Sequence, residues 1–318
     1  MNDPLNASSV NRGQSLTSLG NGTYAYPFAL NLVSLVGALS GDKYLPLWEM
    51  TAAPLRVEIV LQSSAIRSLA TVNATITGFT FTGVNYCGEF LELPDSAVAA
   101  IKAGSSSPMQ VVMPSWRSYT NSANIPDATQ TQVSFPIPAK FSSLKSLMVA
   151  SRTTAGAVAR YPMAHVQLGV GTVNPNTGAP ITTGYQFRVG SEVLPSTAPV
   201  TAAEIYSEAI KCFGSLADLQ LQPSVTKAAF EQNVPTTLTA INIPVTDSGA
   251  FLIGIDMEIY QNADKTAIFS GTNTNTSDIF SIINYYQATG GAINVLQTAF
   301  ACYDQVLVFE NGVCYSRY

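Results

Sequence analysis

Charged side chains are scarce in this sequence. They make up 11% of its 318 residues, whereas about 25% is usual for a soluble domain. Small uncharged polar residues take their place, and hydrophobic residues reach 47%, which is ample for a core. A surface with few charges is cheap to desolvate, and this favours large permanent contacts with other protein surfaces. Because hydrophobic strand patterns recur along the chain, we exclude an intrinsically disordered protein.

The sequence also lacks a basic footprint. Residues 1–160 hold ten Lys/Arg and eight Asp/Glu, and residues 161–318 hold five and twelve. Nucleic-acid binding needs a concentrated basic surface, so we expect no direct sequence-specific contact with nucleic acid. The densest basic group is Lys140, Lys145, Arg152 and Arg160. We interpret these side chains as solvated or as subunit contacts, with phosphate or lipid headgroups as the alternative ligands.

Catalytic and metal-binding motifs are missing as well. The single histidine, His165, lies in an apolar strand pattern, so no His-rich metal site is available and any catalytic triad would need this residue. The four cysteines show neither CxxC nor metal-ligand spacing; they are Cys87, Cys212, Cys302 and Cys314. Free thiols fit a reducing cytoplasm. We therefore predict no enzyme activity and no catalytic, cofactor-binding or metal-binding residues.

One tripeptide has to be weighed against that prediction. Asp247-Ser248-Gly249 matches the turn that carries the carboxylate of aspartic proteases. Those enzymes need two carboxylates that share a proton, and the nearest second match, Pro94-Asp95-Ser96-Ala97, lacks the glycine. We interpret the tripeptide as a polar turn, since Asp, Ser and Gly all favour turns. The alternative is a hydrolase that contributes one half-site to a homodimer.

Two further groups have alternative interpretations. Asp256 and Glu258 lie on one face of a predicted strand, where they could help to hold Ca²⁺, although the usual loop of oxygen ligands is missing. We favour a solvated or subunit-facing pair. Five tyrosines gather in the C-terminal third and could stack on sugars, but we favour burial at protein interfaces. They are Tyr285, Tyr286, Tyr303, Tyr315 and Tyr318.

Long hydrophobic runs are also lacking. The most apolar run, Tyr26–Leu39, is interrupted by polar residues and is too short to span a membrane. The first residues are polar and contain no apolar signal-peptide core. We expect residues 1–20 to be a flexible polar arm.

Strand periodicity dominates what remains. Residues 55–62 and 251–260 alternate apolar and polar side chains, as a half-buried strand does. The other expected strands lie near 24–33, 75–84, 86–93, 109–113, 132–137, 146–152, 165–170, 185–193, 279–286, 292–301 and 304–310. Asn311-Gly312 between alternating segments predicts a hairpin turn that places Cys314 opposite Phe309.

Helices are expected to be few. Asp95 can cap a short helix over 96–103 that Gly104 closes, and Val225–Gln232 is a weaker candidate. The best candidate starts at Thr201, which forms a capping box with Glu204, and ends at Gly214. Its apolar face consists of Ile205, Ala209, Cys212 and Phe213.

About a dozen short strands do not alternate with helices, which excludes a parallel α/β sheet. They are too many for one sandwich, so the pattern predicts two β-sandwiches in tandem. The turn-rich segment 169–184 is either a linker or a long loop at their junction. We place the arm at 1–20, the first sandwich at 21–165 and the second at 166–318.

The order of these segments resembles a known family. PFALNLVSLVG, LPLWEM, LRVEIVLQ and GFTFTGVNYCGEFLEL come first; YQFRVGSEVLP, AAEIYSEAIKCFG, FLIGIDMEIY and SGTNTNTSDIFSIINYY follow. This order is similar to that of double jelly-roll major capsid proteins from tailless viruses with an internal membrane, and in size to those of small lipid-containing bacteriophages, such as the Flavobacterium-infecting one. No single motif carries the resemblance, which extends from about residue 23 to the C-terminus.

The resemblance implies an all-β double jelly roll whose homotrimers form pseudo-hexameric capsomers. These capsomers would tile an icosahedral shell over an internal membrane, contact a vertex or penton protein and assemble in the host cytoplasm into virions. The family implies no catalytic residues. The alternative is a β-sandwich virion spike or carbohydrate-binding module, with a pocket at loop tips around Tyr119–Ile125 or Thr272–Thr276.

Overall fold

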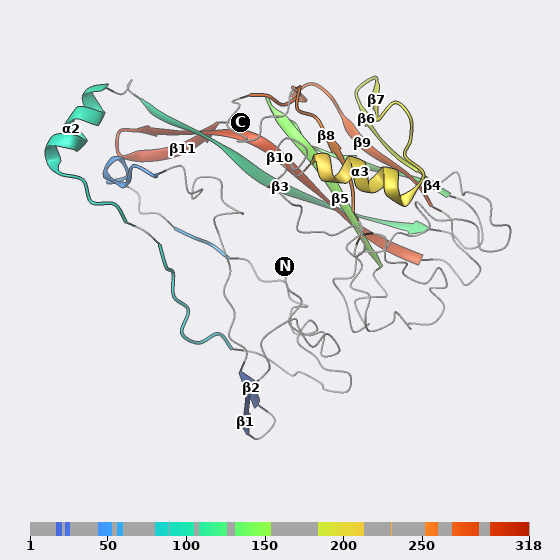
Figure 1. The fold of residues 1–318 in the computed structure, drawn as a ribbon, viewed down its shortest axis with the longest axis horizontal. Helices are drawn as coiled ribbons and strands as arrows, with labels where there is room; N and C mark the ends of the chain where they lie inside the picture. The colour runs from blue at the N-terminus through green and yellow to red at the C-terminus, as the bar shows by residue number, and fades with distance from the viewer. Residues whose placement is uncertain are drawn as a thin grey trace.

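The computed structural model describes residues 17–20, 23–25, 44–52, 56–59, 80–88, 90–104, 108–125, 131–153, 184–212, 230, 252–259, 269–285 and 293–317. The longest strands among these residues form two antiparallel sheets that pack into a sandwich (Figure 1). Within this part of the chain two α-helices are described over their length, both short, and Phe230 is a single further helical residue. The all-β fold class is therefore confirmed. None of the helices described is long and apolar enough to cross a membrane.

The larger sheet is built around one long strand, β10 (Ile293–Glu310). Along one edge of β10 runs β3 (Met109–Ile125), paired from Phe309↔Met109 to Ile293↔Ile125. The other partners of β10 are β5 (Leu144–Thr153) and the terminal strand β11 (Val313–Arg317). Next to β5 lies the short strand β8 (Ile253–Asp256). The segments 292–301 and 304–310, predicted as two strands, are thus one.

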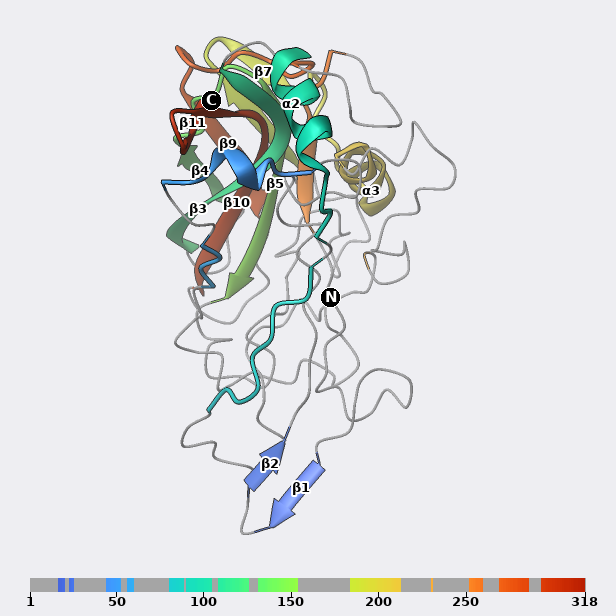
Figure 2. The same cartoon turned by 90° about the vertical axis from the view of Figure 1, so that its left-hand side faces the viewer.

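The second sheet has the order β4 (Thr131–Ile137), β9 (Ile279–Tyr285), β6 (Tyr185–Val189) and β7 (Glu192–Leu194). The single strand predicted over 185–193 is in fact the β6–β7 hairpin, because Gly190 turns the backbone with φ 61°. A separate two-stranded hairpin joins β1 (Thr17–Gly20) to β2 (Thr23–Ala25). It is drawn well apart from the sandwich (Figure 2).

The core lies between the two sheets. The side chains that fill it come from alternate positions of the strands, as the two-residue period requires. Its buried members include Leu147 and Val149 of β5, Phe187 of β6, Ile283 of β9, and Ala299 and Ala301 of β10. The cluster also includes Ile205 of the helix α3 (Ala202–Lys211).

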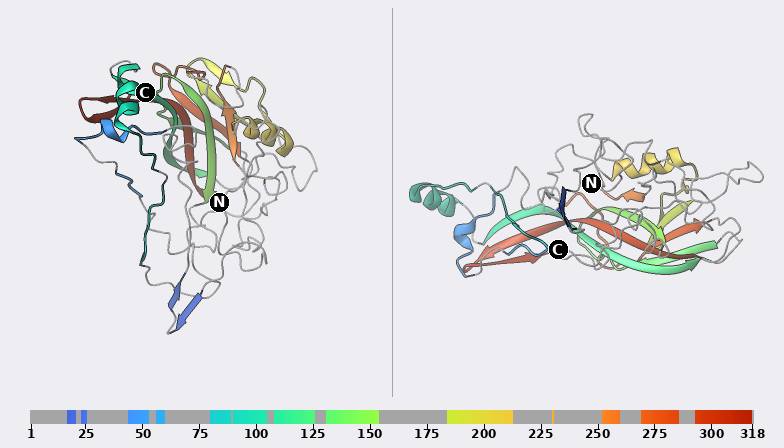
Figure 3. Two further views of the ribbon diagram at one scale, coloured as in Figure 1. Left: turned by 60° about the vertical axis from the view of Figure 1, so that its left-hand side comes forward. Right: turned by 90° about the horizontal axis from the view of Figure 1, so that it is seen from below.

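The helix α3 starts as the sequence predicts. The Thr201 hydroxyl accepts a hydrogen bond from the Glu204 N–H, and the Glu204 carboxylate accepts one from the Thr201 N–H. The last helical residue is Lys211, with Cys212 as C-cap. The predicted end at Gly214 was therefore too late. The helix covers β8, and Figures 1 and 3 show it at a distance from α2 (Asp95–Gly104).

The terminal hairpin is confirmed residue by residue. Asn311 and Gly312 both have positive φ, 53° and 80°, as a tight two-residue turn requires. Glu310 pairs with Val313, and Phe309 pairs with Cys314 as expected. All four cysteines are free thiols.

Several expected strands are absent from the described N-terminal segments. Residues 56–59, 80–88 and 90–94 have no strand structure, and their side chains are mostly exposed. The predictions at 55–62, 75–84 and 86–93 were wrong for these residues. A strand is stabilised by its ladder partner, and none of the described residues pairs with these segments. A short 3₁₀ helix, η2 (Leu47–Glu49), precedes them.

Other predictions fall partly outside the described residues. The strand expected at 165–170 lies there, as do most of 24–33 and the helix 225–232 apart from Phe230. The strands described on the two sides of residue 165 share both sheets: β5 pairs with β8 and β10, and β4 pairs with β9. The division into 1–20, 21–165 and 166–318 stays a prediction.

Candidate functional site

The most unusual chemical feature of the sandwich is a lysine inside the larger sheet. Lys145 lies in β5, between β10 and β8, and is 4% exposed. The pairing of β5 with β10 shifts by one residue between Cys302↔Ser146 and Tyr303↔Leu144. Lys145 is the extra residue of this bulge. Bulges redirect a side chain relative to the ladder, and here the redirected side chain meets two carboxylates.

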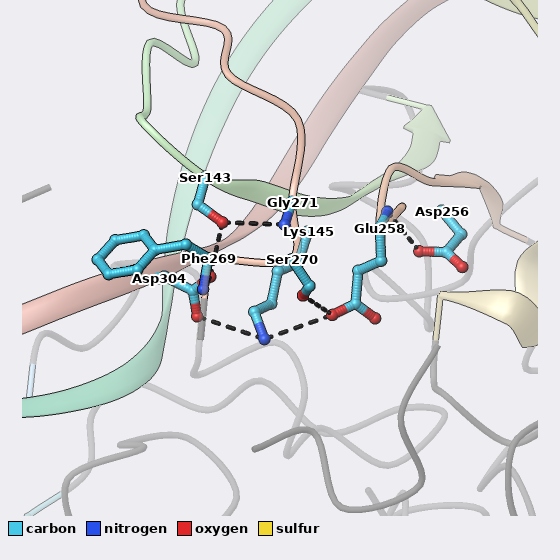
Figure 4. Close-up of polar contacts among 8 residues, drawn as sticks. All are labelled: Ser143, Lys145, Asp256, Glu258, Phe269, Ser270, Gly271 and Asp304. Atoms are coloured by element: carbon cyan, nitrogen blue, oxygen red, sulfur yellow. Dashed lines mark hydrogen bonds and ion pairs between the residues drawn. The ribbon is translucent and has the colours of Figure 1, made fainter. Parts of the chain in front are cut away.

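Lys145 is paired with one acid from each neighbouring element. Its Nζ lies 3.3 Å from Oδ1 of Asp304 in β10 and 3.3 Å from Oε1 of Glu258, just after β8. The three side chains are 5%, 3% and 11% exposed, respectively. Figure 4 shows the ammonium group between the two carboxylates. One cation and two anions are thus held almost free of solvent contact; we name these three residues the buried triad.

Asp304 is fixed on its second oxygen. Oδ2 accepts hydrogen bonds from the Ser143 hydroxyl at 2.6 Å and from the Phe269 N–H at 3.0 Å. The Asp304 N–H donates to the Ser143 carbonyl at 3.0 Å. The carboxylate therefore has two donors on Oδ2 and the lysine on Oδ1. Contacts at both oxygens fix the orientation of the carboxylate group.

Glu258 is fixed in a similar way. Its Oε1 accepts from the Ser270 hydroxyl at 2.7 Å, and its N–H donates to Oδ1 of Asp256 at 3.1 Å. The expectation that Asp256 and Glu258 form a solvated or subunit-facing pair was therefore wrong for Glu258. Sequence periodicity places side chains on a face but does not reveal a cation in the neighbouring strand.

The segment 269–272 closes over the triad. Phe269 has φ 57°, a left-handed conformation that is rare for a bulky residue. Gly271 donates its N–H to the Ser143 hydroxyl at 3.0 Å. A side chain at Gly271 would collide with the Leu144 carbonyl. The segment thus approaches β5 so closely that only glycine fits.

The geometry allows polar chemistry between side chains rather than metal binding. In the part of the chain that is described, no cluster of three or more His, Cys, Asp or Glu side chains could hold a metal ion. The Ca²⁺ alternative for Asp256 and Glu258 is not supported, because Lys145 already neutralises Glu258. The triad does bring an amine, a carboxyl group and a second carboxylate within contact distance of one another.

Several predicted residues lie elsewhere or outside the described residues. Asp247, His165, Arg160 and Tyr286 belong to the latter group, as do the side chains of Arg152, Tyr285 and Tyr318. Lys140 is exposed and lies 3.4 Å from Asp278. The interpretation of Lys145 as solvated or as a subunit contact was wrong, because its side chain is buried and paired with two acids of the same chain.

The tyrosines divide between core and surface. Tyr303 is buried and stacks on Phe141 at 3.8 Å between ring centroids, so its assignment to an interface was wrong. Tyr315 is exposed at the terminal hairpin and donates its hydroxyl to Glu310. Burial raises the pKa of Tyr185 far above its ordinary value, and its hydroxyl donates to the Gly254 carbonyl at 2.7 Å.

The two segments predicted to line a loop-tip pocket differ in structure. Residues 119–125 are part of β3 rather than a loop. In the segment 272–276, Thr272 pairs with Leu144, and Thr274 is fully buried and donates to the Ala139 carbonyl. The loop-tip prediction was therefore wrong for 119–125, whereas Asn275 and Thr276 do form an exposed turn.

Sequence reasoning missed the triad. A signal was present, since Lys145 is a charge within the apolar segment LKSLMVA and Asp304 is the only acid between Ile293 and Val308 in β10. A single charge in a strand expected to be buried indicates a partner. The sequence does not identify that partner, because it lies more than a hundred residues away.

No family model and no curated protein matches the sequence. The structure is similar to the mavirus major capsid protein at 13% identity and a TM-score of 0.39, covering 68% of this chain and 43% of that one. It is also similar to a chain of the PBCV-1 virus capsid, at 10% identity and a TM-score of 0.39. This match covers 70% of this chain and 54% of that one. A third similar structure is a chain of the Sputnik virophage, at 9% identity and a TM-score of 0.38. This match covers 67% of this chain and 39% of that one.

The chain thus spans about half of the length of these proteins or less. They come from virus capsids and virus particles, the class to which the sequence resemblance points; the bacteriophage comparison stays a prediction. Likeness at this level of identity and TM-score does not establish a shared function. We therefore argue function from the residues of this chain.

Proposed function

We propose that this protein is a major capsid protein, a structural protein of a virion that assembles with copies of itself. The observation that carries the proposal is the order of elements in the C-terminal half. The segments of the family resemblance, YQFRVGSEVLP, AAEIYSEAIKCFG, FLIGIDMEIY and SGTNTNTSDIFSIINYY, correspond to β6–β7, α3, β8 and β9. All four pack into one all-β sandwich.

The exposed apolar side chains support self-assembly. In the described N-terminal segments, Val84 and Phe90 are each 76% exposed, and Tyr44 and Leu91 are each 63% exposed. Exposed apolar side chains of this size would bury area if copies of the chain met at these segments. Few charges would have to be desolvated when copies meet, since charged residues are 11% of the sequence.

The finer features of the proposal follow the resemblance. We propose a double jelly roll, homotrimers that act as pseudo-hexameric capsomers, and an icosahedral shell of a bacteriophage over an internal membrane. A vertex or penton protein would complete the shell, and assembly would take place in the host cytoplasm. The role involves no catalysis and no cofactor.

Residues 1–20 would act as an adaptable arm near the membrane or a neighbouring capsomer, although their last four, Thr17–Gly20, form the strand β1 and not the flexible segment expected from the sequence. Deleting these residues tests that role. We expect the shortened chain to form trimers but not closed shells of uniform size. Closed shells of normal size, seen by electron microscopy, would contradict it.

The solution mass of the purified chain tests the proposal as a whole. Light scattering should give three times the chain mass of 33.7 kDa, and the mass should withstand dilution, as expected for an obligate closed trimer. Negative-stain images should show particles with hexagonal outlines. A stable monomer would contradict the proposal and would favour the binding module or spike. A dimer would instead draw attention to the Asp247 half-site, and Asp247→Asn would then test hydrolysis.

A further inference from the structure

The buried triad places three groups in the arrangement that amide formation needs. Lys145 supplies an amine, Asp304 supplies a carboxyl group, and Glu258 lies beside the amine. The Lys145 Nζ is 3.3 Å from Oδ1 of Asp304, and this oxygen is bonded to Cγ, the carbon that the amine would attack. All three side chains are held almost free of solvent contact (Figure 4).

We propose that Lys145 and Asp304 condense to an isopeptide bond in the folded chain. This bond would join β5 to β10 covalently, with Glu258 as the catalytic residue that transfers the proton. The proposal concerns a modification of the chain itself. It does not depend on the capsid role or on the oligomeric state.

The step balances without any added reagent. Glu258 accepts one proton from the Lys145 ammonium, and the free amine attacks Cγ of Asp304. The bond from Cγ to Oδ1 then breaks, and Oδ1 leaves as water with two protons, one returned by Glu258 and one from the attacking nitrogen. The ammonium and carboxylate charges cancel in the amide, so no oxidant, reductant or activating group is required.

The remaining contacts polarise the carboxyl group that is attacked. Oδ2 of Asp304 accepts from the Ser143 hydroxyl and the Phe269 N–H. Two donors on one oxygen stabilise the negative charge that develops there during attack on the carbon. They also determine which oxygen stays as the amide carbonyl and leave Oδ1, on the lysine side, as the leaving group.

Burial favours the product over the starting pair. A buried ion pair carries a desolvation penalty that a neutral amide avoids. Exclusion of water from the site also removes the reagent that would hydrolyse the bond. The β-bulge at Lys145 aims the amine at Asp304, and β10 and β5 are fixed by their ladder on both sides of the bulge.

The test is the intact mass of the purified full-length chain under denaturing conditions, from a sample that unfolds cooperatively. We expect a mass below that of the sequence by one water molecule. Proteolysis should then release a branched peptide that joins the Lys145 segment to the Asp304 segment. The full sequence mass would overturn the proposal. So would a water loss that maps to a single linear peptide, because that result indicates a cyclic imide at an aspartate instead.

Three variants assign the roles. Lys145→Arg keeps the positive charge but removes the amine, so the full sequence mass should return. Glu258→Gln keeps the shape of the side chain and removes the proton acceptor, so the linked fraction should fall sharply. Asp304→Asn should lose ammonia rather than water if it links at all. A fully linked Glu258→Gln chain would overturn the role of Glu258. The branched peptide of the unaltered chain remains decisive even if a variant does not fold.

Discussion

Residues 131–137 and residues 80–94 carry similar alternating sequences but have different structures. In β4, Phe135 and Ile137 are buried, and Ser134 and Pro136, which alternate with them, are exposed. In 80–88 and 90–94, the aromatic residues Phe81, Tyr86 and Phe90 are all exposed and the described residues form no strand. The difference between the two is a partner: β4 pairs along its whole length with β9.

This contrast shows that alternation indicates only the capacity to form a strand. The ladder partner and the layer that covers one face turn that capacity into structure. For residues 80–94, the described part of this chain supplies neither. If the protein assembles as proposed, another copy is the natural source of both.

The largest expected difference comes from the same truncation in the two regions. Phe187→Ala empties a fully buried site in β6 and should lower the free energy of unfolding by about 3–5 kcal/mol. Phe90→Ala removes a side chain that is 76% exposed and should change it by less than about 0.5 kcal/mol. Denaturant titration of the dissociated chain measures both. Equal losses would mean that residues 80–94 are packed in the isolated chain.

A glycine pair sharpens the comparison. Gly271→Ala should destabilise the sandwich by about 1–3 kcal/mol, because the new methyl group would collide with the Leu144 carbonyl. Gly104→Ala is the matched control at the end of α2, where a methyl group meets nothing within 4 Å. It should be neutral or slightly stabilising. The melting temperatures of both variants measure the two effects. An unchanged melting temperature for Gly271→Ala would contradict the close packing of 269–272 on β5.

The terminal hairpin and α3 could be predicted from the sequence because local chemistry determines both. Asn311-Gly312 supplies two residues that accept positive φ, and Thr201 with Glu204 satisfies the free N–H groups at a helix start. Neither feature needs information from distant residues. Strand length was less predictable: β10 is continuous where two strands were expected, since its pairing with β3 extends past Tyr303.

The buried triad was not predictable for the opposite reason. Its three residues come from β5, the segment after β8, and β10, and the bulge that aims Lys145 arises from the register of two strands. In the sequence, Lys145 is only one of several basic residues in the same region. Only the pairing of distant strands shows that two acids enclose it.

A smaller effect is expected at the start of α3. Thr201→Ala removes the hydroxyl that accepts the Glu204 N–H and should lower stability by about 1 kcal/mol. Because α3 buries Ile205 in the core, this loss should appear in the global unfolding transition. Thr201→Ser retains the hydroxyl and serves as the control. An unchanged transition in Thr201→Ala would mean that α3 unfolds independently of the sandwich.

The smallest effect concerns pH. The N–H groups of Val200 and Thr201 donate to the Glu204 carboxylate and hold the pKa of Glu204 below its ordinary value of 4.5. Since the folded chain binds this proton less readily than the unfolded chain, the contribution of Glu204 is present above about pH 4.5 and is lost as pH falls through the lowered pKa. Melting temperatures of the parent chain and of Glu204→Gln, compared from neutral to acidic pH, isolate the effect, because the amide does not titrate.

Asp95→Asn makes the same change in the first turn of α2, which buries no side chain, and should leave the global transition unmoved. Superimposable pH profiles for the parent and Glu204→Gln would show that the capping carboxylate contributes nothing to folding, and α3 would then be held by its apolar face alone.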